Sequence, residues 1–169
     1  IAYDNAWWLL PNSVGDEEIR SEMELIELSN GNYRIAVPYY SYSLDAVSLF
    51  VAELDTDGDT LSSNKLSLQR FGTDAYIKGV EFSPNGRYLY FTHLTNALNT
   101  TPVKVYDFNT SNYVTITDTT FLSEIDDFKK SFIELSGDGK LYLANDTHLA
   151  IIDDADTPTS LTWNNSAVS

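Results

Sequence analysis

Short apolar runs separated by tight polar turns recur along the chain, and three of these turns share one pattern. In each, an apolar stretch ends in a polar turn that contains glycine, and a second apolar stretch follows at once. Asn-Gly and Asp-Gly favour the positive φ angles that close a hairpin, and the flanking Tyr, Phe, Ile, Val and Leu suit strands. The pattern predicts three β-hairpins, at Leu28–Val37, Phe82–Phe91 and Leu135–Ala144.

The three hairpins are almost evenly spaced. Their turn glycines, Gly31, Gly86 and Gly139, are 55 and 53 residues apart. Near-equal spacings above forty residues indicate one supersecondary unit that repeats, as in the blades of a propeller. A third strand is predicted in each unit at 47–54, 103–108 and 148–152, and a fourth at 65–71, 113–117 and 160–163. Four short strands per unit is the arrangement of a propeller blade.

We therefore predict an all-β, β-propeller-like fold of about three four-stranded antiparallel blades, which is a partial or open propeller. The predicted divisions are a less regular N-terminal segment, or the end of a preceding blade, at 1–22, and blades at 23–75, 76–122 and 123–169. A short helical or loop connection precedes the last blade, with Ser123–Ser131 as the candidate helix. The chain opens on Ile1 without a signal-peptide pattern, and we expect it to be a segment of a longer protein.

The composition narrows the classes of partner. Asp and Glu number 25 against 10 Lys and Arg, a formal net charge of −15, which disfavours nucleic acid and anionic membrane surfaces. No apolar run approaches the roughly 20 residues of a spanning helix, so we expect no membrane insertion. Cysteine is absent, which excludes disulfides, thiolate zinc sites and a cysteine nucleophile.

Motifs of the common catalytic classes are also missing. The sequence has no G-x-S-x-G, G-x-x-x-x-G-K-[ST], G-x-G-x-x-G or H-E-x-x-H. The two histidines, His93 and His148, fall at or near predicted strand ends and have no neighbour in sequence that would make either a general base. We therefore predict no catalytic residue, no enzyme activity and no required cofactor.

An acidic run is the candidate metal site. Asp55, Asp57 and Asp59 alternate as the first ligands of calcium loops do. Gly58 stands at the fourth position rather than the sixth, and Leu66 occupies the twelfth, so the run is not an EF-hand. The main interpretation is a polar hairpin turn closed by Asp-Gly, and calcium binding by the three aspartates is the alternative.

Aromatic side chains form the other candidate site. Tyr40 and Tyr42 follow a predicted strand, and Trp8 lies in the N-terminal segment. Exposed Tyr and Trp rings stack on sugars or hold peptides, whereas buried rings pack one blade against the next. We name Trp8, Tyr40 and Tyr42 as candidate ligand-binding residues, although packing between blades is the main interpretation for Trp8 and Tyr40.

Four motifs, in order, support a family resemblance. Gly79–Tyr90 (GVEFSPNGRYLY) is similar to a "GVEFSPDGKxLY" element, and Val105–Phe108 to a "YQFDL" element. Ile133–Ala144 (IELSGDGKLYLA) is similar to "LQLAPDGKIYVA", and Leu149–Pro158 to "LGVINNPNAPG". With these elements the chain resembles the propeller repeats of large surface proteins of Bacteroidetes-type bacteria, which are exported by the type IX system and often carry gliding-motility-associated domains. The resemblance implies a secreted or cell-surface module.

Together these features predict a non-catalytic propeller module that binds a protein or a glycan, or acts as a scaffold, at the cell surface. One alternative is an enzyme on a propeller scaffold, a hydrolase or lyase acting on glycans, because fold alone does not decide function. Another is an assembly module, because three blades do not close a ring and their open edges can pair with another copy or another chain.

Overall fold

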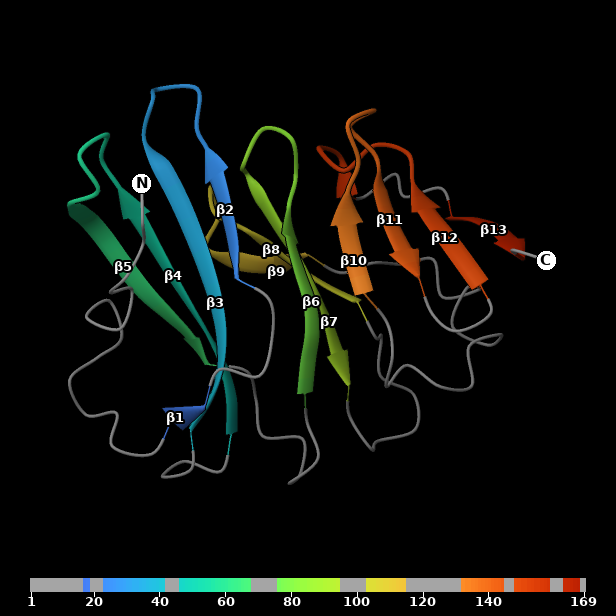
Figure 1. The fold of residues 1–169 in the computed structure, drawn as a ribbon, viewed down its shortest axis with the longest axis horizontal. Coiled ribbons are helices and arrows are strands. Elements are labelled where there is room, and N and C mark those ends of the chain that lie inside the picture. The colour runs from blue at the N-terminus through green and yellow to red at the C-terminus, as the bar shows by residue number, and fades with distance from the viewer. Residues whose placement is uncertain are drawn as a thin grey trace.

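The structure of the chain is a computed structural model that describes residues 17–18, 23–41, 46–67, 76–94, 103–114, 132–144, 148–158 and 163–167. Within these ranges the chain forms β-strands and tight turns and contains no α-helix. All strand pairs are antiparallel and belong to three sheets that follow one another along the chain (Figure 1). The predicted all-β class is thereby confirmed. The described residues hold no helix that is long and apolar enough to cross a membrane.

The first sheet has a central hairpin and a split inner edge. β3 and β4 form the hairpin, β5 pairs with the outer side of β4, and both β1 and β2 pair with the free side of β3. β2 lies along the start of β3, and β1 lies against Tyr40 and Ser41 at its end. The sheet thus has five strands where four were predicted, because two short strands share the innermost position. The bounds are β1 Glu17–Glu18, β2 Glu24–Glu27, β3 Tyr33–Ser41, β4 Ala46–Leu54 and β5 Thr60–Ser67.

The second and third sheets are four-stranded meanders, in which each strand pairs with the next along the chain. The second sheet consists of β6 Tyr76–Phe82, β7 Tyr88–Leu94, β8 Val103–Asp107 and β9 Asn112–Val114. The third consists of β10 Phe132–Leu135, β11 Leu141–Ala144, β12 His148–Ile152 and β13 Trp163–Ala167. In Figure 1 the three sheets lie side by side, and the β2–β3, β6–β7 and β10–β11 turns point to the same edge.

Neighbouring sheets pack through opposite faces. In the second sheet, Leu89 and Phe91 pack in one apolar cluster with Ala36 of the first sheet. Tyr88 and Tyr90, the residues that alternate with them along β7, pack in another cluster with the third sheet. Successive side chains of a strand point to opposite faces of its sheet, so the second sheet is covered on both sides. We call the face turned toward the preceding sheet the back face and the face turned toward the following sheet the front face.

The same faces meet at both interfaces. The front face of the first sheet (Ile26, Ala36, Leu49, Val51) packs on the back face of the second (Val80, Phe82, Leu89, Phe91, Tyr106). The front face of the second (Tyr88, Tyr90, Val103, Val105) packs on the back face of the third (Ile133, Leu135, Leu141, Leu143, Ile152). The sheets therefore stack head to tail and do not close a ring. Full burial of each large apolar side chain stabilises the stack by about 1.5–3 kcal/mol.

The outer strands differ from their predicted bounds. β5 begins at Thr60 rather than residue 65, since the turn after β4 is tight and pairing resumes at once. β9 begins one residue earlier than predicted, at Asn112, and β13 continues to Ala167 instead of ending at Trp163. The candidate helix at 123–131 lies outside the described residues. The domain bounds 1–22, 23–75, 76–122 and 123–169 stay predictions, and residues 17–18 of the first segment form β1 of the first sheet.

Candidate functional site: the glycine turns and the contacts between sheets

The three predicted glycine turns share a glycine of positive φ and the backbone hydrogen bond that this glycine donates. Each glycine has a positive φ, of 85° at Gly31, 70° at Gly86 and 79° at Gly139. L side chains rarely adopt this conformation, which explains glycine at all three positions. Each glycine N–H donates to the carbonyl three residues earlier, at 2.8–2.9 Å: Gly31 to Leu28, Gly86 to Ser83 and Gly139 to Ser136.

The residue before each glycine closes the turn from its side chain. Asn30, Asn85 and Asp138 each accept, through Oδ1, the backbone N–H two residues further on, at 3.0, 2.8 and 3.2 Å. Asn and Asp favour such turns because a short side chain reproduces a backbone turn. The side-chain oxygens are therefore used inside the turns.

A cross-strand pair joins each turn to the third strand of its sheet. The residue after the glycine donates to an acidic residue near the end of that strand. The pairs are Asn32 Nδ2 to Glu53 Oε1 at 3.1 Å, Arg87 to Asp107, and Lys140 Nζ to Asp153 Oδ1 at 2.6 Å. The pair thus repeats with the sheets, although the donor changes from an amide to a guanidinium to an ammonium group.

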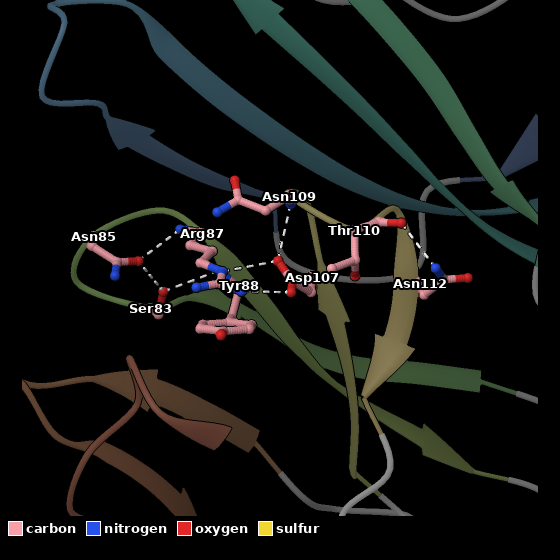
Figure 2. A network of polar contacts seen from close by, with 8 residues as sticks. All are labelled: Ser83, Asn85, Arg87, Tyr88, Asp107, Asn109, Thr110 and Asn112. Atoms are coloured by element: carbon pink, nitrogen blue, oxygen red, sulfur yellow. Dashed lines mark hydrogen bonds and ion pairs between the residues drawn. The ribbon is translucent and has the colours of Figure 1, made fainter. Parts of the chain in front are cut away.

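The Arg87–Asp107 pair of the second sheet is bidentate. Arg87 Nε donates to Asp107 Oδ1 at 3.0 Å and Arg87 Nη2 to Oδ2 at 2.9 Å, while the N–H of Asn109 also donates to Oδ1 (Figure 2). The Asp107 side chain is 6% exposed and that of Arg87 is 39% exposed. The hydrogen bond from Arg87 lowers the pKa of Asp107 to about 2, and the same bond raises the pKa of Arg87.

We expect Asp107→Asn to lower the free energy of unfolding at pH 7 by about 1–3 kcal/mol, because it removes the acceptor of charged hydrogen bonds. A carboxyl whose pKa is lowered on folding stabilises the protein above its unfolded pKa, and that contribution disappears as the pH falls through the folded pKa. The difference between Asp107→Asn and the unchanged chain should therefore shrink from about pH 4 to about pH 2, the value to which the pKa of Asp107 is lowered.

Urea midpoints at several pH values measure this prediction. Asp153→Asn is the matched control, because Asp153 forms the equivalent pair in the third sheet but is 45% exposed. Exposed ion pairs contribute about 0–1 kcal/mol, so the control should have the smaller effect. An equal loss at Asp107 and Asp153, or a difference that does not change with pH, would contradict the proposed role of the buried pair.

Polar side chains also join the first sheet to the second. Arg34 on β3 donates through Nη1 to the carbonyl of Gly86 at 2.5 Å and through Nη2 to Glu53 at 3.2 Å. Its Cζ lies 4.1 Å from the ring centroid of Phe108, within cation–π distance. Arg34 lies on the front face of the first sheet and thus binds the glycine turn of the second sheet.

Polar contacts between described residues also join the second sheet to the third. Glu81 on β6, 7% exposed, accepts the N–H of Leu135 through Oε2 at 2.9 Å. The hydroxyl of Tyr90 on β7, which is fully buried, donates to the carbonyl of Ala155 at 2.7 Å. Burial raises the pKa of Tyr90, so the ring stays a neutral donor. The N–H of Asn85 donates to Asp156 Oδ1 at 3.1 Å.

The predicted aromatic site is only partly within the described structure. Trp8 and Tyr42 lie outside the described residues. Tyr40 belongs to β3, where its backbone pairs with Glu18 and Val47. Ligand binding by Trp8, Tyr40 and Tyr42 stays a prediction.

The predicted calcium residues lie in the turn between β4 and β5. Asp55 Oδ1 accepts the N–H groups of Asp57 at 3.0 Å and Asp59 at 2.9 Å, and Gly58 donates to the carbonyl of Asp55 at 3.1 Å. These hydrogen bonds match the hairpin interpretation, because one carboxylate oxygen of Asp55 stabilises the turn itself. No group of three His, Cys, Asp or Glu placed to hold a metal ion occurs in the described part of the chain.

We expect millimolar calcium to leave the melting temperature within error of that in chelator, since Asp55 already bonds within its turn. A ligand that binds only the folded state raises the melting temperature by mass action. Thermal unfolding with calcium and with chelator measures the effect, and Asp57→Asn is the variant to compare. A rise in calcium that Asp57→Asn abolishes would establish the site instead.

Sequence reasoning did not single out the residues that join the sheets. Glu81 and Arg34 are charged residues within largely apolar strands, and this is the only sequence feature that marks them. Tyr90 enters the sequence analysis only as one residue of the second predicted hairpin. The backbone partner lies 52 residues away in sequence for Arg34, 54 for Glu81 and 65 for Tyr90. Spacing along the sequence therefore does not reveal these partners.

Comparisons with known proteins add one distant likeness. The chain matches no protein-family model and no curated protein sequence. Among solved structures, it is similar to the extracellular domain of a putative hybrid two-component system from B. thetaiotaomicron, with a TM-score of 0.45 and 10% sequence identity. The match covers 86% of this chain and 24% of that chain, so the chain spans about a quarter of that structure's length. At this similarity the match assigns neither a family nor a function.

Proposed function

We propose that the chain is a non-catalytic, β-propeller-type module of a secreted or cell-surface protein, and that it binds a protein or a glycan or acts as a scaffold. The observation that carries the proposal is the head-to-tail stack of three antiparallel sheets with the same turn in each. Radial repetition of four-stranded sheets is the arrangement of a propeller. The ordered motifs that resemble type IX-exported surface proteins support the location.

The use of the charged groups supports a structural role for this part of the molecule. Arg87 and Asp107 bind each other, Arg34 binds Glu53 and a backbone carbonyl, and Glu81 accepts backbone N–H groups. Catalytic acids and bases stand free to meet a substrate with a pKa matched to the reaction. These groups instead hold turns and sheets in place.

Two other functions remain as alternatives. An enzyme acting on glycans, a hydrolase or lyase, requires two or more converging catalytic groups, and it is distinguished by product release. An assembly module requires that open strand edges pair with another chain, and it is distinguished by the mass in solution.

Binding and turnover can be separated in one experiment. The 169-residue chain is applied to an array of bacterial and host glycans and to immobilised cell-envelope proteins, and the supernatants are analysed for released sugars. We expect retention on a subset of probes without released sugar. Retention should fall in Trp8→Ala, Tyr40→Ala or Tyr42→Ala and persist in Tyr113→Ala, a half-exposed tyrosine outside the predicted set. Released sugar would establish the enzyme instead, and no retention on any probe would contradict a binding role.

A further inference from the structure

Two of the repeated turns contain the pair Asn-Gly, at Asn30-Gly31 and Asn85-Gly86. This pair is prone to spontaneous deamidation, because glycine has no side chain to hinder attack by its own backbone nitrogen. That nitrogen forms a bond to Cγ of the asparagine, the bond from Cγ to Nδ2 breaks, and Nδ2 takes up the proton and leaves as ammonia. Water then opens the cyclic imide at either carbonyl and gives aspartate or isoaspartate.

The closed form of each turn opposes this reaction. Each glycine N–H donates to the carbonyl three residues earlier, and each asparagine Oδ1 accepts the N–H two residues further on. The reaction requires that the glycine nitrogen lose its proton and that the asparagine Cγ turn toward that nitrogen, so these bonds must break first. The rate of deamidation therefore depends on how readily each turn opens.

The turn at Asn85 is held by both neighbouring sheets. From the first sheet, Arg34 donates to the carbonyl of Gly86 at 2.5 Å. From the third, Asp156 Oδ1 accepts the N–H of Asn85 itself at 3.1 Å. The Ser83 hydroxyl also donates to Asn85 Oδ1 at 3.0 Å (Figure 2). Opening this turn therefore breaks contacts with two other sheets as well as those within the turn.

The turn at Asn30 is held by its own sheet. Asn30 is exposed, and in the part of the chain that the structure describes the hydrogen bonds of residues 30–32 stay within the first sheet. Asn32 Nδ2 reaches Glu53, and a Cβ at Gly31 would meet only Thr56, at 3.8 Å. This turn can therefore open without disturbing the second sheet.

We propose that Asn30 is a site of spontaneous deamidation in the folded chain, and that contacts with the neighbouring sheets protect Asn85. The aspartate product suits the turn, because Asp138 holds the equivalent place in the third sheet, where its Oδ1 accepts the N–H of Lys140 at 3.2 Å. The isoaspartate product adds a carbon atom to the backbone between residues 30 and 31 and so disrupts the hydrogen bonds of the turn. Both products add one negative charge.

Peptide mass spectrometry tests the proposal. The folded 169-residue chain is incubated in mildly alkaline buffer and cut with trypsin, which places Asn30 in peptide 21–34 and Asn85 in peptide 79–87. We expect Asn30 to convert about tenfold or more faster than Asn85, because the second turn has more hydrogen bonds to break. Asn32, in the same peptide as Asn30 but followed by Tyr33, should stay unchanged. In chain unfolded with guanidinium, Asn30 and Asn85 should convert at rates within about twofold of each other.

A variant tests the cause of the protection. Asp156→Ala removes the acceptor of the Asn85 N–H and should speed conversion of Asn85 by about threefold or more without changing Asn30. Asp153→Ala is the matched control, since Asp153 binds Lys140 in the third sheet, and it should change neither rate.

Three outcomes would overturn the proposal. The first is equal conversion of the two asparagines in the folded chain. The second is an Asn30 that converts only after unfolding. The third is an Asp156→Ala variant that leaves Asn85 as slow as before. None of these outcomes depends on a ligand, so failure here leaves the proposed binding function untouched.

Discussion

Gly86→Val should be among the most destabilising single substitutions in the described part of the chain, with an expected loss of about 2–5 kcal/mol in the free energy of unfolding. Gly86 has a φ of +70°, which a β-branched residue adopts only with strain. A Cβ at this position would also lie 2.5 Å from Cδ2 of Leu28 and 3.5 Å from Cγ2 of Ile26 on the first sheet. The substitution therefore strains the turn and displaces the Leu28 side chain that packs against it. Urea midpoints measure the loss.

Gly58→Val is the control that separates the two causes. Gly58 has a φ of +88°, but a Cβ there meets no atom within 4 Å. Gly58→Val should therefore lower the free energy of unfolding only through backbone strain, by about 1–3 kcal/mol. His93→Ala and His148→Ala, at the two histidines that sequence analysis left without a role, should cost less than Gly86→Val. If Gly86→Val and Gly58→Val were equally destabilising, the contact between the turn and the first sheet would contribute nothing.

Gly79→Ala should open the interface between the second and third sheets, at an expected cost of about 2–3 kcal/mol. A Cβ at Gly79 would lie 2.7 Å from the backbone N of Ile133 and 3.0 Å from its Cγ2. A backbone atom does not move aside as the end of a side chain does, so β6 and β10 must separate. That separation would lengthen the hydrogen bond from the N–H of Leu135 to Glu81, which is 2.9 Å.

Two readouts together identify this mechanism. The urea midpoint reports the overall loss, and hydrogen exchange at Leu135 reports the opening of the interface. Gly137→Ala is the matched control, because Gly137 lacks a positive φ and a Cβ there meets no atom within 4 Å. Faster exchange at Leu135 in Gly79→Ala but not in Gly137→Ala is the expected result. Loss of stability with unchanged exchange at Leu135 would show that the close approach of β6 and β10 is not the cause.

The local structure of the hairpins follows from the sequence alone. Asn-Gly and Asp-Gly determine the turns, because a short polar side chain caps the turn and glycine takes the positive φ. The strands on either side follow from runs of β-branched and aromatic residues, which is why the hairpins around Gly31, Gly86 and Gly139 are found where the pattern predicts them. These are interactions between residues close in sequence, so neighbouring residues suffice to predict them.

Strand ends and the inner edge of the first sheet depended on more than local pattern. β5 begins at Thr60 because pairing with β4 starts directly after the turn, at Leu54 and Thr60, and continues past one irregularity to Glu53 and Ser62. Glu17–Glu18 and Glu24–Glu27 carry acidic residues that strands seldom prefer, and they are strands because β3 offers two separate stretches of unpaired backbone. Pairing with a distant strand outweighed local preference at these positions.

The order of the sheets and the groups that join them were decided only by the tertiary structure. Nothing in the spacing of Glu81, Tyr90 or Arg34 identifies a partner, because each partner is a backbone group 52 to 65 residues away, and every residue carries such groups. Which face of each sheet is covered is likewise a property of the stack, since Glu81 and Glu134 stand at the same distance before their turn glycines yet one is buried and the other is exposed. The sequence by itself determined the repeated unit, through short-range turn and strand chemistry. Long-range packing determined how the units meet.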